Sequence, residues 1–140
     1  AATEQGDPET LECGCQYVGF GLRTFAYVSV YRCSLYVDPD SAAEKLQFFA
    51  GRTHEELCAD PAFYARFVKA HFDKTLRLVF LRSVSESRLR SGFREPLLRR
   101  VGREGAEDAL RLISAVPEVE QGDVLLLRLH GDGRTLDVAR

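Results

Sequence analysis

The feature that most constrains the fold is a run of strand-forming residues, VGFGLRTFAYVSVYRCSLYV, at positions 18–37. β-Branched and aromatic side chains of this kind are enriched in β-strands. A Gly-x-Gly pair near the start of the run is typical of a β-bulge or of a close approach to another backbone, and Arg23 comes shortly after it. The sequence therefore predicts two long strands, over 11–21 and 25–37, with a cation between them.

The cation of Arg23 needs an explanation, because a guanidinium does not lose its charge at ordinary pH. If this side chain is buried in a sheet, it requires an anionic partner or several hydrogen-bond acceptors. That partner is either a carboxylate of this chain or a ligand. The third alternative, which the residues alone favour, is that Arg23 extends from a strand end into water.

Helix-starting signals occupy the middle of the chain. Capping boxes at Ser41 and Thr53 predict a helix that runs to Phe49 and then a second, brief helical turn. Asp60 followed by proline predicts a third helix over 61–72, because proline is favoured at the first helical position. We therefore expect the two long strands to be followed by helices rather than by more sheet.

The second half of the chain predicts one strand, further helices and a closing hairpin. The apolar segment at 75–81 is typical of a buried strand, and a capping box at Ser83 predicts a helix that is kinked or divided at Pro96. Another helix is expected over 104–115, and Asp132-Gly133 between two β runs is a strong hairpin signal. This order predicts an α+β fold, an antiparallel sheet with helices packed on one face.

Length and charge restrict the class of protein. A chain of 140 residues with 45% hydrophobic residues fits one domain, which we expect over 11–140 after a disordered or trimmed tail at 1–10. A formal net charge of -2 gives no reason to expect nucleic acid as a partner. No apolar run approaches the roughly 20 residues that cross a bilayer, so we do not expect an integral membrane protein.

No catalytic or metal-binding motif stands out. The Gly-x-Gly pair lacks the third glycine and the following helix of a dinucleotide-binding fingerprint. The histidines are dispersed, and Cys13 and Cys15 form a C-x-C pair without the second pair of ligands that a zinc site needs. We therefore expect no metal and no cofactor, with cysteines that are ordinary small side chains in a reducing compartment.

Three separated segments resemble the chalcone isomerase fold family, in the same order along the chain. VGFGLRT followed by YRCSLYV resembles that family's Gly-x-Gly-x-Arg strand segment. GRTHEELCADPAFYARFVKAHFDKTLRL resembles the helices and strand entry that follow, and RLRSGFREPL resembles a helix of the branches that are not plant isomerases. The resemblance implies an open-faced antiparallel sheet covered by helices, with a ligand cleft between them.

The resemblance to the true isomerases is incomplete at the positions that carry their chemistry. Arg23 matches the arginine that polarises the chalcone, but Tyr31 stands at the threonine position of those enzymes. Leu89 and Pro96 stand where a tyrosine and an asparagine belong, and neither side chain donates a hydrogen bond. The resemblance therefore favours a branch without isomerase activity.

Arg23 together with Tyr31 instead resembles the fatty-acid-binding branch, in which an arginine and a strand tyrosine hold a carboxylate. A guanidinium binds both carboxylate oxygens and a phenol adds a third donor, while burial stabilises an acyl tail by about 0.8 kcal/mol per CH₂. The resemblance therefore predicts a protein that binds a small apolar carboxylate, such as a fatty acid, without catalysis. The predicted ligand-binding residues are Arg23, Tyr31, Phe20, Phe25 and Tyr27, the last three as cleft walls or, equally, as plain core.

Two alternatives stay open. One is an intramolecular lyase of the chalcone–flavanone isomerase type, with Arg23 as its catalytic residue. The other is a mitochondrial member of the fold that binds haem through a histidine such as His71. The resemblance implies the plastid stroma for a plant or algal member and a mitochondrion for a fungal-type one. Either the chain is C-terminally truncated relative to the family, or its cleft is more open. The sequence leaves the oligomeric state open.

Overall fold

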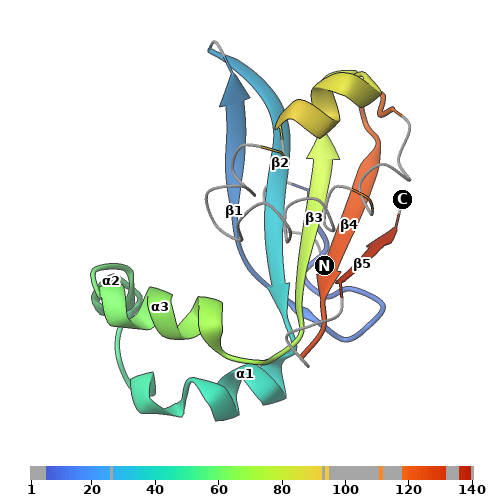
Figure 1. Cartoon of the computed structure of the whole chain (residues 1–140). Coiled ribbons are helices and arrows are strands. Elements are labelled where there is room, and N and C mark those ends of the chain that lie inside the picture. Colours follow the sequence, from blue (N-terminus) through green and yellow to red (C-terminus); the bar gives the residue numbers. More distant parts are fainter. Residues whose placement is uncertain are drawn as a thin grey trace. The chain divides into compact units, whose positions relative to one another are not determined.

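The computed structural model describes residues 6–25, 27–92, 94, 111, 118–131 and 136–139. Within these residues a five-stranded antiparallel sheet has the strand order β1-β2-β3-β4-β5 (Figure 1). Its strands are β1 (Gln16–Phe25), β2 (Val28–Val37), β3 (Lys74–Phe80), β4 (Val124–Leu129) and β5 (Leu136–Ala139). The α+β class with an open antiparallel sheet is the predicted one.

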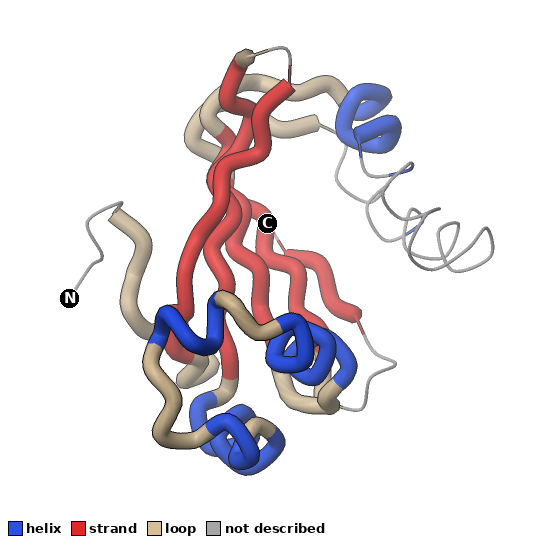
Figure 2. Tube along the Cα trace, turned by 90° about the vertical axis from the view of Figure 1, so that its left-hand side faces the viewer, coloured by secondary structure: helices blue, strands red, loops and turns tan. Residues whose placement is uncertain are grey.

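Four short helical segments connect β2 to β3. They are α1 (Pro39–Lys45), the 3-10 helix η1 (Gln47–Phe49), α2 (His54–Cys58) and α3 (Pro61–Lys69). Figure 2 shows these segments gathered beside one another, and α2 contacts α3 as α1 contacts η1. Residues 86–92 form a further helix after β3.

Contacts group the chain into two compact units. Unit 1 comprises Ala1–Gly19, Leu35–Thr75 and Arg128–Leu136. Unit 2 comprises Phe20–Ser34, Leu76–Leu127 and Asp137–Arg140. Unit 1 thus holds the helices between β2 and β3, and unit 2 holds the turn between β1 and β2.

The core of unit 1 is built on aromatic rings. Phe63 and Phe67 lie one helical turn apart on α3, with their ring centroids 5.9 Å apart. Phe63 contacts Phe49 edge-on at 5.3 Å, and Phe67 contacts Phe72 edge-on at 5.3 Å. Such pairs contribute about 0.5–1.5 kcal/mol each beyond the area they bury. The line of rings holds α3 against η1 and against the segment that enters β3.

The N-terminal segment packs into unit 1. Asp7 is fully buried, and the Tyr36 hydroxyl donates a hydrogen bond of 2.6 Å to the carbonyl oxygen of Pro8. Thr10 forms an isolated antiparallel bridge with Gln16. Residues 6–10 of the expected tail are therefore part of unit 1, and residues 1–5 lie outside the described residues.

The core of unit 2 lies along β3 and β4. Phe80 is buried and its ring centroid lies 5.5 Å from that of Tyr31 on β2. Leu81 N donates to Val30 O at 2.9 Å, and Phe80 N donates to Asp123 O at 2.9 Å, so β3 bonds to a strand on each side. Among the described residues of the unit, the other buried apolar side chains are Leu78, Leu89, Val119, Leu125 and Leu127.

The predicted boundary of the first strand is wrong. Residues 11–15 form a turn, in which Gly14 N donates to Leu11 O at 2.9 Å and Gly14 has a φ of 84°. A strand cannot continue through that left-handed residue, so β1 begins at Gln16 and runs to Phe25. Arg23 is consequently within the first strand rather than between two strands.

Two of the predicted helix starts are confirmed. Thr53 Oγ1 accepts a hydrogen bond of 3.2 Å from Glu56 N, and Asp60 Oδ1 accepts one of 2.9 Å from Ala62 N. The start at Ser41 is wrong, because α1 begins earlier with Pro39 in its first turn and Asp38 at its N-cap.

The start at Ser83 is also wrong. The following Val84 pairs with Val119 in an isolated bridge, and Ser85 Oγ accepts from Arg88 N at 3.4 Å. The cap thus moves two residues along the chain.

Several predictions fall on residues that the structure does not describe. The kink at Pro96, the helix over 104–115 apart from residue 111, and the Asp132-Gly133 turn lie outside the described residues. The two strands of the predicted closing hairpin, β4 and β5, are neighbours in the sheet. Among the described residues, no helix has the length and apolarity needed to cross a membrane.

Candidate functional site

Arg23 lies near the end of β1 in unit 2, and its side chain is exposed. Of the alternatives for Arg23, the structure therefore shows the exposed side chain that the residues alone favour, and not a buried cation. β1 is at the edge of the sheet order, with a neighbouring strand on one side only, and residues 21–24 of this strand are all exposed. In the described part of the chain, no carboxylate forms an ion pair with Arg23.

Tyr31, on β2 of the same unit, is half-buried against Phe80. Burial raises the pKa of its phenol, the charge of Cys33 adds to this rise, and the charge of Arg23 opposes it. The hydroxyl is protonated at neutral pH, as that of an ordinary tyrosine is, so Tyr31 can donate a hydrogen bond there. The electrostatic effect of Arg23 on Tyr31 is the interaction that joins the two predicted ligand-binding residues.

The three predicted wall residues are placed differently. Phe20 has 45% of its surface exposed and Tyr27 is fully exposed at 106%, so neither belongs to a core. Tyr27 lies in the turn between β1 and β2 with a φ of 66°. Phe25 is the last residue of β1, and its side chain is outside the described part.

A separate groove of about 520 Å³ lies in unit 1. One side is formed by the end of α1 and by η1, and the other side by α3. The guanidinium of Arg52 lies over the rings of Phe48 and Phe49, at 5.4 and 5.0 Å from their centroids. The groove contains none of the predicted ligand-binding residues. Its lining residues are Glu44, Lys45, Gln47, Phe48, Phe49, Ala62 and Arg66.

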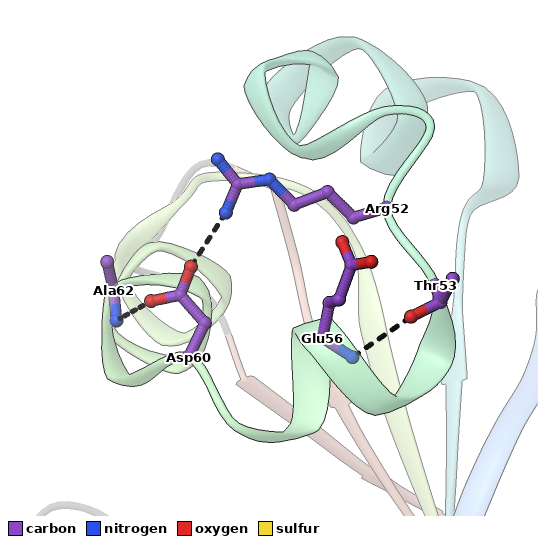
Figure 3. A network of polar contacts seen from close by, with 5 residues as sticks. All are labelled: Arg52, Thr53, Glu56, Asp60 and Ala62. Atoms are coloured by element: carbon purple, nitrogen blue, oxygen red, sulfur yellow. Dashed lines mark hydrogen bonds and ion pairs between the residues drawn. The ribbon is translucent and has the colours of Figure 1, made fainter.

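A polar network fixes the segment that carries α2 and α3 (Figure 3). Arg52 Nη1 donates to Asp60 Oδ2 at 2.8 Å, while the other oxygen of Asp60 caps α3. Thr53 caps α2 in the same network. The side chains of His54 and Cys58 on α2 are thus presented by a short helix whose start and surroundings are held in place.

Three polar side chains meet at Cys15 in unit 1. Burial raises the pKa of the Cys15 thiol to about 11, Cys13 adds to the rise, and Thr75 and Arg128 oppose it. Thr75 Oγ1 and Arg128 Nε are both buried, and neither atom forms a hydrogen bond of ordinary distance and angle. The neutral thiol of Cys15 therefore suits packing more than chemistry.

Sequence reasoning missed a pair of residues that the structure brings together. Cys58 Sγ lies 3.5 Å from His54 Nε2 and 4.0 Å from His54 Nδ1 on α2. The signal was an H-x-x-x-C spacing, which places two side chains on one face of a helix. By contrast, His71 falls within the helix predicted over 61–72, but it follows the end of α3 and is exposed.

Comparison with known proteins establishes the fold. No family model matches the sequence, and no curated protein matches it. The structure is similar to that of the Arabidopsis thaliana fatty-acid binding protein AtFAP1, with a TM-score of 0.80 and 18% sequence identity, over 99% of this chain and 76% of that one. The protein therefore has the chalcone isomerase-like fold that the sequence resemblance implied.

Proposed function

We propose that the protein binds a small apolar carboxylate, such as a fatty acid, at the β1–β2 hairpin of unit 2. Arg23 is the carboxylate anchor and Tyr31 the second donor. The observation that carries the proposal is the placement of an exposed guanidinium, Arg23, and a half-buried phenol, Tyr31, on the paired strands β1 and β2 of one hairpin. Similarity of fold to a fatty-acid binding protein supports the ligand class.

The exposure of Arg23 is compatible with this role. An exposed guanidinium keeps its hydration while no ligand is present and so avoids the penalty of an unpaired buried charge. A carboxylate that reaches it gains a charge-assisted hydrogen bond, and the Tyr31 phenol adds another. Phe20 and Tyr27 are exposed and offer apolar surface to an acyl chain, and Phe25 is proposed as the third wall residue.

The experiment is a binding titration with lauric, myristic and palmitic acid, followed by native mass spectrometry and calorimetry. We expect Arg23→Gln to weaken binding by about tenfold to a hundredfold, because a hydrogen bond to a charged group contributes about 1.5–3 kcal/mol. Tyr31→Phe should weaken it less. Arg66→Gln, a cation of the unit 1 groove, is the matched control and should bind as the wild type does. Unchanged binding by Arg23→Gln would reject the proposed anchor.

Two further assays define the function around this site. We propose that the protein does not convert chalcone to flavanone, because the residues matched to the isomerase partners include Leu89, which is buried and apolar. Absorbance of a chalcone solution tests this, and turnover that disappears in Arg23→Gln would favour the lyase instead.

We also propose the plastid stroma as the location, and a fluorescent fusion of the full-length gene product tests that placement.

A further inference from the structure

The outer edge of β1 is covered over only part of its length. β1 has a hydrogen-bonded strand, β2, on one side (Figure 1). On its other side the N-terminal segment pairs with the start of the strand: Tyr17 N donates to Glu9 O at 2.9 Å, and Thr10 forms an antiparallel bridge with Gln16. In the described part of the chain, no strand or bridge continues this pairing along 20–24. We infer that this open edge, residues 20–24, pairs with the same edge of a second copy of the chain.

The backbone groups of Gly21 and Arg23 face the open side. Successive residues of a strand direct their N–H and C=O groups to alternate sides, and Tyr17 directs its N–H away from β2, towards Glu9. Gly21 and Arg23 lie an even number of residues further along the same strand. They therefore also direct one donor and one acceptor each outward, and such a row of groups is a template for a further strand.

No bulge interrupts this alternation. β1 and β2 each have ten residues. Tyr17 is the second residue of β1 and Tyr36 the second-last of β2, and their rings contact each other edge-on at 5.7 Å. An extra residue in either strand would shift these two side chains to opposite faces of the sheet. The direction of the backbone groups can therefore be followed from Tyr17 to Arg23.

The exposed side chains of the open edge complement each other in one antiparallel register. Phe20 and Leu22 are 45% and 54% exposed, and side chains two residues apart point to the same face. A two-fold axis at Leu22 places this residue opposite Leu22 of the second copy, and Phe20 opposite Thr24. Aromatic side chains paired with β-branched ones stabilise neighbouring strands. This register therefore covers both exposed apolar side chains.

The same register suits the charge of Arg23. The axis at Leu22 places Arg23 opposite Gly21, which has no side chain, and these two residues exchange backbone hydrogen bonds. An axis at Arg23 itself would place two like charges directly opposite each other, which destabilises a sheet. An axis at Gly21 would shift the second copy towards the part of the edge that the N-terminal segment occupies.

The contact is small, so the dimer is weak. Specific stable interfaces bury about 1,200–2,000 Å², and five residues from each copy bury less. We therefore expect monomers and dimers in exchange, with a dimer fraction that rises with protein concentration. The pairing uses the backbone of Arg23, so its side chain stays available to the proposed carboxylate.

The first test is sedimentation velocity at protein concentrations from micromolar to millimolar. The wild type should form a concentration-dependent dimer. Leu22→Lys should weaken it at least about tenfold, because two like charges then lie opposite each other. Val18→Lys is the matched control, since Val18 is 51% exposed on the same strand but lies outside the open edge, and it should dimerise as the wild type does. Arg23→Gln should also dimerise, which separates this proposal from carboxylate binding.

Two results would overturn the pairing at this stage. One is a wild type that stays monomeric at every concentration. The other is an equal loss of dimer in Leu22→Lys and Val18→Lys, which would indicate an effect of added charge rather than of position. Both side chains are exposed, so both variants should keep the wild-type far-ultraviolet circular dichroism.

A disulfide tests the register, in protein whose exposed cysteines, Cys13 and Cys58, are replaced by serine. Leu22→Cys should crosslink two copies on mild oxidation, because the Cα atoms of such a non-hydrogen-bonded pair are about 4.5 Å apart, a separation that a disulfide spans. Thr24→Cys is the matched control. Its two copies are offset by roughly 13 Å along the strands and should stay monomeric. If Thr24→Cys crosslinks as readily as Leu22→Cys, the proposed pairing is wrong.

Discussion

At Asp60 a single carboxylate serves two partners. Oδ1 accepts from the backbone N–H of Ala62 and caps α3, while Oδ2 accepts from Arg52 at 2.8 Å. The two interactions contribute different amounts to the free energy of unfolding. A helix N-cap is worth about 1 kcal/mol, whereas an ion pair between partly exposed side chains is worth roughly 0–1 kcal/mol. The cap should therefore account for most of the contribution of Asp60 to stability.

Substitution of Asp60 separates these two roles. Asp60→Ala removes both and should lower the free energy of unfolding by about 1–2 kcal/mol. Asp60→Asn keeps an oxygen that can cap α3 and removes the charge, so it should lose less than half of that amount. Urea denaturation of the two variants and the wild type measures the difference. Equal losses in both variants would mean that the ion pair, not the cap, dominates.

The residues that sequence reasoning placed correctly act through their nearest neighbours in the chain. Thr53 and Asp60 cap helices through bonds to residues two or three positions later, and such bonds depend on local sequence alone. The sequence left alternatives for Arg23, because its exposure depends on what covers each face of the sheet, a property of the whole fold. The H-x-x-x-C spacing of His54 and Cys58 is visible in the sequence. It brings the two side chains together only because both residues lie in the same helix, α2.

At the scale of elements, the turn between β1 and β2 differs from ordinary hairpin turns in the residue that adopts a positive φ. Tight hairpin turns need residues with positive φ and favour glycine and asparagine. Here Tyr27 adopts a φ of 66°, a conformation that costs an L-residue with a bulky side chain roughly 1–2 kcal/mol. Its side chain is fully exposed and so gains no packing in return. No glycine or asparagine marks this turn, which is why the sequence did not predict the strand ends.

Replacing Tyr27 by asparagine should relieve this cost. Tyr27→Asn is expected to raise the free energy of unfolding by about 0.5–1 kcal/mol, because asparagine tolerates the left-handed region. Tyr64→Asn is the matched control, since Tyr64 is also exposed but lies in α3, where asparagine is a weaker helix former and should destabilise slightly. Thermal and urea unfolding measure both variants. If Tyr27→Asn lowers the free energy of unfolding, the positive φ of Tyr27 does not cost the folded state the expected amount.

The same variant bears on function at the scale of the hairpin. Backbone strain tends to persist where a site requires it. If Tyr27 is a wall of the proposed carboxylate site, Tyr27→Asn should bind palmitic acid more weakly although the protein is more stable. A stabilised variant with unchanged binding would remove Tyr27 from the proposed site and leave Arg23 and Tyr31 in place.

At the scale of the whole molecule, the buried acids of the two units act in the same direction. Burial raises the pKa of Cys15 in unit 1 and of Tyr31 and Cys33 in unit 2. Each group is neutral below its unfolded pKa, so its contribution to stability is complete there and is lost as the pH rises through the folded value. Lys74 opposes them, because burial lowers its pKa and the folded state therefore gains stability as the pH rises from that lowered value to 10.5.

We therefore expect the free energy of unfolding to fall between about pH 9 and pH 11, the interval between the ordinary pKa of a cysteine thiol, 9.0, and that of Cys15. Cys15→Ala should be less stable at neutral pH, because a buried side chain is shortened, yet should lose less stability across this interval. Cys13→Ala removes only the smaller contribution that Cys13 makes to the pKa of Cys15, so it should reduce the slope less than Cys15→Ala does. Urea unfolding under reducing conditions at successive pH values measures all three slopes. If Cys15→Ala shows the wild-type slope, the alkaline loss arises from Tyr31 and Cys33 in unit 2, and unit 1 does not contribute to it.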